Sequence, residues 1–206
     1  MFYLDDFTVG RQFDLGHYTL SQDEIIEFAK AYDFQDFHTD PEAAKQSIFG
    51  GLIASGWQTA GICMKLVCQA FMTQTACNGS PGIQDLKWLK PVRPGDRLTG
   101  FVRVTGQVPS KSKPDRGASL QHWALQNQNG ETVFCADVTV LMMRTPQPIE
   151  QTPAVAAVAA TAAATATPAS NEMNTANSSR EELEKWRAQA QSLWFNDGSC
   201  TSGKPE

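Results

Sequence analysis

Two side chains that can carry protons, Asp33 and His38, stand five residues apart in the segment AYDFQDFHTDPEAA, which begins at Ala31. A carboxylate and an imidazole held in one short loop can share a water, one group accepting a proton and the other returning one. An apolar stretch follows, and if a helix begins at its Gly56, the backbone N–H there can stabilise a developing oxyanion. From residue types alone, the simpler interpretation is that Asp33 is a helix cap and His38 a turn histidine.

The loop that carries these two residues lies between two predicted helix boundaries. Ser21 and Glu24 have the spacing of a capping box, which predicts the start of one helix. We expect that helix to end near Tyr32. The dipeptide Asp40–Pro41 predicts the start of the next helix, because proline loses no hydrogen bond at the first helical position. Loops held in this way often carry catalytic side chains.

A long apolar helix is predicted over residues 55–73. Its apolar residues occur on nearly every side and include Trp57, Ala60, Ile62, Met64, Leu66, Val67 and Phe71. A helix of this kind is normally buried, so we expect a sheet to curl about it. Gly50 and Gly51 permit tight bends before the helix. For Gly56, close packing of the helix against a neighbour is an alternative to a role as an oxyanion donor.

From residue 83 onward the apolar residues alternate as in strands. Stretches with this pattern cover residues 83–90, 97–108, 118–128 and 131–144, and a further strand is expected within residues 4–20. Asn129–Gly130 predicts a tight hairpin turn. Because helices precede an antiparallel meander, the fold class is α+β.

Composition limits the partners and the compartment. The formal net charge is −5, which argues against nucleic acid or an anionic membrane as the main partner. The five cysteines are odd in number and contain no CxxC pair, so neither a disulfide framework nor a zinc site is expected. The N-terminus lacks an apolar run typical of a secretory signal, and residues 56–72 are too polar to span a bilayer. We therefore expect a soluble cytoplasmic protein.

A basic loop lies between two of the predicted strands. It carries Lys111, Lys113 and Arg116, with Asp115 as its one acid. Two interpretations stay open, a contact to the 3′-phosphate or pyrophosphate of coenzyme A and a solvated hairpin loop.

The composition changes after residue 146. Residues 147–178 are rich in Ala, Thr and Pro and are predicted to be a disordered linker between the domain 1–146 and a helix at 179–196. That helix is amphipathic and carries Trp186 and Trp194 on one face, so we expect it to dock in a groove on a partner protein. The alternative is that it folds back on its own domain or on a second copy. Residues 197–206 are expected to be a disordered tail.

The polar loop and the helix start together resemble a known family, the MaoC-like acyl dehydratases, which include the (R)-specific enoyl-CoA hydratases. The usual signature of that family is Asp-x-Asn-Pro-x-His-x-Asp, and residues 33–40 of this chain read Asp-Phe-Gln-Asp-Phe-His-Thr-Asp. Gln35 stands where Asn is common. Asp36 stands where Pro is common, and its added charge is expected to raise the pKa of Asp33 or His38. The family also has a glycine at the start of the central helix, here Gly56, commonly preceded by His, where this chain has Ser55.

The resemblance covers about residues 4–144 and implies a hot-dog fold, in which an antiparallel sheet wraps around a long central helix. It also implies a homodimer that binds an acyl-CoA substrate, with no metal and no redox cofactor. The implied reaction is the reversible hydration of trans-2-enoyl-CoA to 3-hydroxyacyl-CoA. The expected catalytic residues are Asp33, His38 and Gly56, and the expected substrate-binding residues are Gln35, Phe37, Ser55, Lys111, Lys113 and Arg116.

Two other functions are compatible with a hot-dog fold. Acyl-CoA thioesterases of this fold usually place a carboxylate on or near the central helix, and residues 56–72 contain no acid. A non-catalytic acyl-binding or assembly module acting through the C-terminal helix is the other alternative. The presence of both Asp33 and His38 favours an enzyme over such a module.

Overall fold

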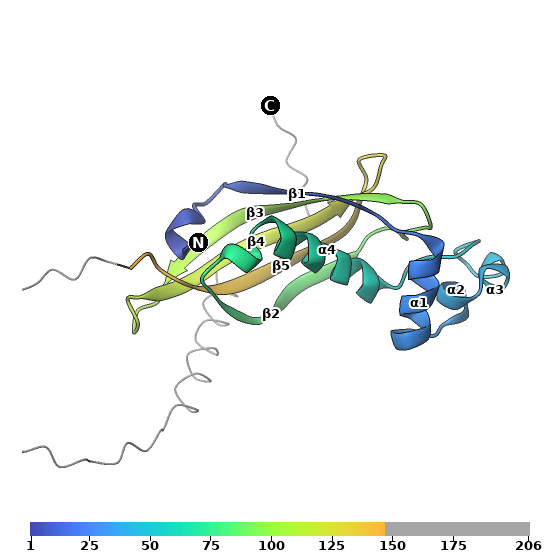
Figure 1. Ribbon diagram of the computed structural model, residues 1–206, viewed down its shortest axis with the longest axis horizontal. Coiled ribbons are helices and arrows are strands. Elements are labelled where there is room, and N and C mark those ends of the chain that lie inside the picture. Colours follow the sequence, from blue (N-terminus) through green and yellow to red (C-terminus); the bar gives the residue numbers. More distant parts are fainter. Residues whose placement is uncertain (147–206) are drawn as a thin grey trace, which may run out of the picture. The chain divides into compact units, whose positions relative to one another are not determined.

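The computed structural model describes residues 1–146, which form one antiparallel sheet and a long helix, α4 (Gly56–Ala70), that lies along it (Figure 1). The strand order in the sheet is β1-β3-β4-β5-β2, and every neighbouring pair is antiparallel. The strands are β1 (Gln12–Thr19), β2 (Cys77–Trp88), β3 (Arg97–Pro109), β4 (Arg116–Gln126) and β5 (Thr132–Met143). This arrangement confirms the predicted α+β class and hot-dog fold. The predicted linker 147–178, helix 179–196 and tail 197–206 lie outside the described residues.

Short helices gather beyond the N-terminal end of α4 (Figure 1). They are α1 (Gln22–Tyr32), α2 (Asp36–Thr39) and α3 (Pro41–Lys45), and two 3₁₀ turns, η1 (Leu4–Asp6) and η2 (Met72–Gln74), lie elsewhere in the chain. Both predicted boundaries are confirmed. The side chain of Ser21 accepts the Glu24 N–H while the Glu24 carboxylate accepts the Ser21 N–H, and the Asp40 carboxylate caps α3. The loop between Tyr32 and Asp40 is therefore held at its first end by the Asp33 N–H, which donates to the Ala29 carbonyl, and at its second end by the Asp40 cap.

Helix α4 is buried on one side only. Cys63, Leu66 and Val67 are buried in the core, whereas 63% of Trp57 and 43% of Met64 are exposed. The expectation that α4 is buried on every side is therefore wrong for a single chain, because the sheet covers only one side of the helix. The helix is also shorter than predicted, since the helical backbone stops before Phe71.

A bend leads from α3 to the start of α4 and is tied to its surroundings by backbone hydrogen bonds. Gly50 has a φ of 64°, a left-handed conformation that glycine adopts without strain. The Ile53 N–H donates to the carbonyl of Phe37 at 3.1 Å, and the Ala54 N–H donates to the carbonyl of Val92 at 2.8 Å. The bend therefore brings the N-terminus of α4 against α2.

Within residues 1–146, no helix has the length and hydropathy needed to cross a membrane.

Candidate active site

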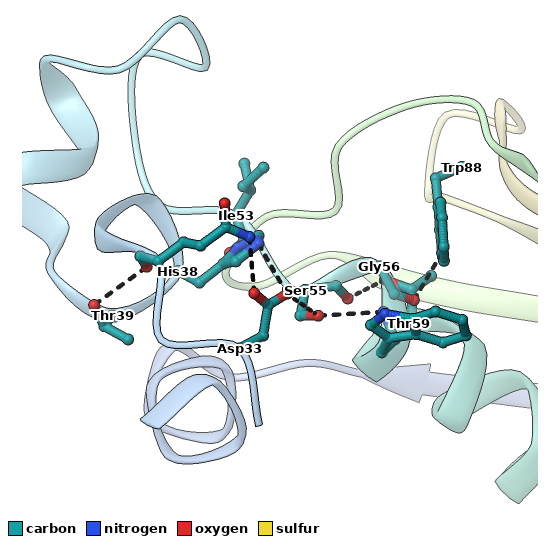
Figure 2. A network of polar contacts seen from close by, with 10 residues as sticks. Asp33, His38, Thr39, Ile53, Ser55, Gly56, Thr59 and Trp88 are labelled. Carbon is teal, nitrogen blue, oxygen red and sulfur yellow. Dashed lines mark hydrogen bonds and ion pairs between the residues drawn. The ribbon is translucent and has the colours of Figure 1, made fainter. Parts of the chain in front are cut away.

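Asp33 lies where α1 ends, and its side chain faces the start of α4 (Figure 2). Its backbone N–H continues the helical pattern by donating to the carbonyl of Ala29 at 2.9 Å. Its carboxylate accepts two side-chain hydrogen bonds, from the Ser55 hydroxyl to Oδ2 at 2.7 Å and from the Gln35 amide to Oδ1 at 2.8 Å. Asp33 is thus the C-cap of α1 through its backbone N–H, while its side chain bridges to Ser55, 22 residues later in the sequence.

His38 lies on α2 and is buried. Its Nδ1 is 2.8 Å from the carbonyl oxygen of Ile53. Because a carbonyl can only accept, the hydrogen of the neutral ring is on Nδ1, and Nε2 keeps its lone pair. The ring of Phe37 packs edge-on against the imidazole, with 4.5 Å between ring centroids. The orientation of His38 is therefore determined by the backbone and by packing.

Asp33 and His38 face each other. Oδ2 of Asp33 is 3.4 Å from Nε2 of His38, which is longer than an ordinary N–H···O hydrogen bond. Two acceptor atoms at this separation can both be reached by one water molecule placed beside them. The structure thus brings together the two residues that the sequence pairs.

The pKa of Asp33 is lowered. Burial alone would raise it, but the hydrogen bonds from Ser55 and Gln35, and the positive charge that the neighbouring His38 carries when protonated, favour the charged carboxylate and outweigh the burial. The expected rise from Asp36 is therefore wrong for Asp33. Asp36 is exposed at the first position of α2 and is not among the causes of this shift.

Ser55 and Gly56 form the N-terminus of α4. The Ser55 hydroxyl accepts the Trp57 N–H at 3.2 Å, so Ser55 is the N-cap of the helix. Gly56 is the first helical residue, and its N–H has no acceptor in a preceding turn. Such an N–H at the positive end of a helix dipole is suited to an oxyanion.

Gly56 is also required by packing. The indole of Trp88 covers it, and a Cβ built at position 56 would lie 2.6 Å from Cε2 of that ring. The Trp88 Nε1–H donates to the Gly56 carbonyl at 2.7 Å (Figure 2). Close packing at Gly56, one of the two interpretations of this glycine, is therefore confirmed, and it is compatible with the other.

Three of the predicted substrate-binding residues surround the Asp33–His38 pair. Gln35 and Ser55 donate to Asp33, and Phe37 packs against His38. Each of them thus contacts a member of the pair, and Ser55 is fully buried.

The basic loop with Lys111, Lys113 and Arg116 is not brought to this site within one chain. The bend beside the site pairs with Val92, just before β3, whereas the loop follows the other end of that strand. With 13 residues, β3 spans ~40 Å. Figure 1 shows the loop between β3 and β4 at the end of the sheet away from α1. The prediction that these residues contact the 3′-phosphate or pyrophosphate of a coenzyme A bound at this site is therefore not supported for a single chain.

Two contributors to the site are absent from the sequence-based predictions. The Ile53 carbonyl sets the tautomer of His38, and Trp88 covers Gly56. A backbone acceptor has no side-chain signature, and Trp88 is separated from Gly56 by 32 residues, so neither contact has a local signal in the sequence.

Among residues 1–146, no three His, Cys, Asp or Glu side chains are grouped to hold a metal ion.

Comparisons with known proteins identify relatives of this chain. A family model described as the MaoC like domain matches residues 6–122. The uncharacterized protein YdeM of Bacillus subtilis is 33% identical over 142 residues, which cover 68% of this chain and 99% of YdeM. An (R)-specific enoyl-CoA hydratase of Rhodospirillum rubrum is 32% identical over 111 residues, 53% of this chain and 74% of the hydratase. The crystal structure of a MaoC-like dehydratase from Rhodospirillum rubrum superimposes with a TM-score of 0.65 at 38% identity, covering 71% of this chain and all of that chain.

Proposed function

We propose that this chain, which belongs to the MaoC-like dehydratase family, reversibly hydrates a trans-2-enoyl-CoA to the (R)-3-hydroxyacyl-CoA. The observation that carries the proposal is the facing pair of acceptors, Oδ2 of Asp33 and Nε2 of His38, beside the N-terminus of α4. The relative named as an (R)-specific enoyl-CoA hydratase supports the substrate class and the stereochemistry.

The pair would hold the reacting water. The water oxygen forms a bond to C3 of the enoyl group while one of its protons passes to the pair. The electrons of the double bond move toward the thioester carbonyl, and a proton returned from the pair to C2 completes the addition. The product gains one OH and one H, the pair recovers its starting protonation, and the thioester is the only electron sink required. The proposed chemistry therefore uses no metal and no redox cofactor.

The Gly56 N–H would stabilise the charge that develops on the thioester oxygen. It stands at the start of α4, one residue from the Ser55 side chain that contacts Asp33. Loss of one such donor typically costs ~100–1000-fold in rate. Because the Gly56 N–H and the Asp33–His38 pair lie on adjacent segments, one bound thioester would be able to contact both.

A homodimer is part of the proposal. Strand β2 is at one edge of the sheet, and Ile83, Trp88 and Leu89 are exposed on or next to it, as are Trp57 and Met64 on α4. The opposite edge strand, β1, instead exposes Asp14 and His17. An apolar surface next to an unpaired strand edge favours association, and a second copy of this chain would cover it at β2.

The test is a hydration assay with crotonyl-CoA and longer trans-2-enoyl-CoA substrates. We expect the absorbance of the enoyl thioester band to fall without release of free thiol. The product should be oxidised by an (R)-specific but not by an (S)-specific 3-hydroxyacyl-CoA dehydrogenase. Thiol release without hydration would replace the proposal with a thioesterase. Binding without turnover over the whole panel would replace it with an acyl-binding module.

A further inference from the structure

The Ser55 hydroxyl makes two hydrogen bonds that join the two halves of the site (Figure 2). It donates to Oδ2 of Asp33 at 2.7 Å and accepts the Trp57 N–H at 3.2 Å. A hydroxyl has one proton to donate, so that proton is committed to the carboxylate. Ser55 is fully buried, so its hydroxyl is shielded from bulk solvent.

The oxygen that Ser55 binds is the one that faces the imidazole. Oδ2 of Asp33 is also the atom 3.4 Å from Nε2 of His38, whereas Oδ1 is bound by Gln35 on the exposed side of the loop. A buried hydrogen bond to a charged group is stronger than a solvent-exposed one. Ser55 therefore has more control than Gln35 over the direction in which the carboxylate points.

The same hydroxyl fixes the end of the helix. As the N-cap of α4, it orients the first turn, and the next residue is Gly56. One oxygen atom thus contacts both the carboxylate and the helix end that carries the proposed oxyanion donor. A change in its position would move the carboxylate relative to that donor.

We propose that Ser55 is a positioning residue, which holds Oδ2 of Asp33 toward Nε2 of His38 and in register with the Gly56 N–H. The inference rests on the proposed function of the Asp33–His38 pair. It replaces the expectation that Ser55 contacts substrate, because the hydroxyl proton is already used by Asp33.

The first test is kinetic. Ser55→Ala and Ser55→Gly should each lower kcat on the order of 10–100-fold with little change in KM, because the lost bond orients the reacting groups rather than the substrate. Ser55→Thr keeps the hydroxyl and should recover most of the rate. Glycine is tolerated at an N-cap almost as well as serine, so Ser55→Gly separates the loss of the hydroxyl from the loss of the cap.

The matched control is Ser21→Ala. Ser21 is the N-cap of α1, and its hydroxyl bonds with Glu24 rather than with Asp33. This variant loses a helix cap of the same kind and should keep the kcat of the wild type. An equal loss of kcat in Ser21→Ala and Ser55→Ala would overturn the proposal, since it would reduce the effect to helix stability.

A second readout is independent of turnover. Carbon-13 NMR of the aspartate carboxyl groups, with the Asp33 signal identified by its absence in Asp33→Asn, should show that the pKa of Asp33 rises in Ser55→Ala and Ser55→Gly. An unchanged Asp33 titration in both variants would overturn the positioning role. If the wild type hydrates no enoyl thioester but the titration shifts as expected, the proposed function fails while the contact between Ser55 and Asp33 holds.

Discussion

The indole nitrogen of Trp88 donates a hydrogen bond to the carbonyl of Gly56, and the same ring occupies the space that a side chain at position 56 would need. Glycine at the start of α4 is thus explained by packing as well as by the proposed chemistry. The two explanations can be separated experimentally, because one concerns stability and the other concerns rate.

Gly56→Ala should destabilise the protein by about 1–3 kcal/mol, because the new Cβ collides with a well-packed ring. Replacing that ring in Gly56→Ala/Trp88→Leu should recover part of this loss, so that the two changes are not additive. Urea unfolding of the wild type, both single variants and the double variant measures the coupling. Gly61→Ala is the matched control, since a Cβ there meets nothing within 4 Å, and it should be neutral or stabilising. Additivity within ~0.5 kcal/mol would show that Trp88 does not restrict position 56.

Asp33→Asn and His38→Gln should each reduce kcat by at least ~100-fold while the protein stays folded, because each removes one of the two proton-transfer groups. Hydration of crotonyl-CoA gives the rate, and far-UV circular dichroism reports the fold. Asp36→Asn changes the charge of an exposed aspartate in the same loop and should leave the rate near that of the wild type. A variant of Asp33 or His38 that turns over normally would exclude that residue from the mechanism.

The stabilising effect of Asp33 should depend on pH. Its pKa in the folded chain lies below the ordinary value of 3.8, so the ionised side chain stabilises the fold above that value. This contribution declines as the pH falls through 3.8 toward the lowered pKa. We therefore expect the difference in unfolding free energy between the wild type and Asp33→Asn to be constant from pH 5 to 7. Below pH 5 this difference should shrink. Urea titrations across this range provide the measurement, and a difference that grows as the pH falls would contradict the lowered pKa.

Truncation after residue 150 should leave hydratase activity and the melting temperature unchanged. The described domain is closed before that point, since the Asp5 carboxylate accepts hydrogen bonds from the Arg144 guanidinium at 2.9 and 3.1 Å and from the Thr145 N–H at 2.8 Å. Truncation after Met143 removes these contacts and should cost about 1 kcal/mol, as should Asp5→Ala. Thermal unfolding of the three variants tests the boundary. Collapse of the fold on truncation after residue 150 would show that the domain extends further.

Ile83→Lys should convert the proposed dimer to a monomer. Ile83 is 54% exposed on the edge strand β2, and a charge buried there against a second copy would have no partner. Ile48→Lys is the control, because Ile48 is 96% exposed and lies outside both β2 and α4. Light scattering after size-exclusion chromatography should give twice the chain mass for the wild type and Ile48→Lys, and the chain mass for Ile83→Lys. A monomeric wild type would remove the dimer from the proposal.

Local chemistry made parts of this structure predictable. The capping box at Ser21 locates the start of α1 and the pair Asp40–Pro41 locates the start of α3, because each boundary is set by hydrogen bonds within a few residues. Alternation of apolar residues predicts the strands, although β2 begins at Cys77, before the predicted stretch 83–90. The proximity of Asp33 and His38 could be predicted because the two residues are close in the sequence and lie on one loop between two helix boundaries.

Contacts across the fold were not predictable from the same signals. The exposed side of α4 was missed because composition reports how apolar a helix is, not how much of it a sheet can cover. The position of the basic loop relative to the site was not predictable, because a charge pattern carries no information about which end of the sheet lies next to Asp33 and His38. The bond between Ser55 and Asp33 has no local signal in the sequence, because 22 residues separate them.

The tautomer of His38 depends on an atom that every amino acid possesses. Because the partner of Nδ1 is the main-chain carbonyl of Ile53, replacing the side chain at position 53 leaves that acceptor in place. Alanine substitution at position 53 would therefore not reveal the role of this carbonyl. Inserting a single residue into the bend before it should displace the carbonyl, release the imidazole and abolish the proposed hydration, although Asp33 and His38 themselves are unchanged.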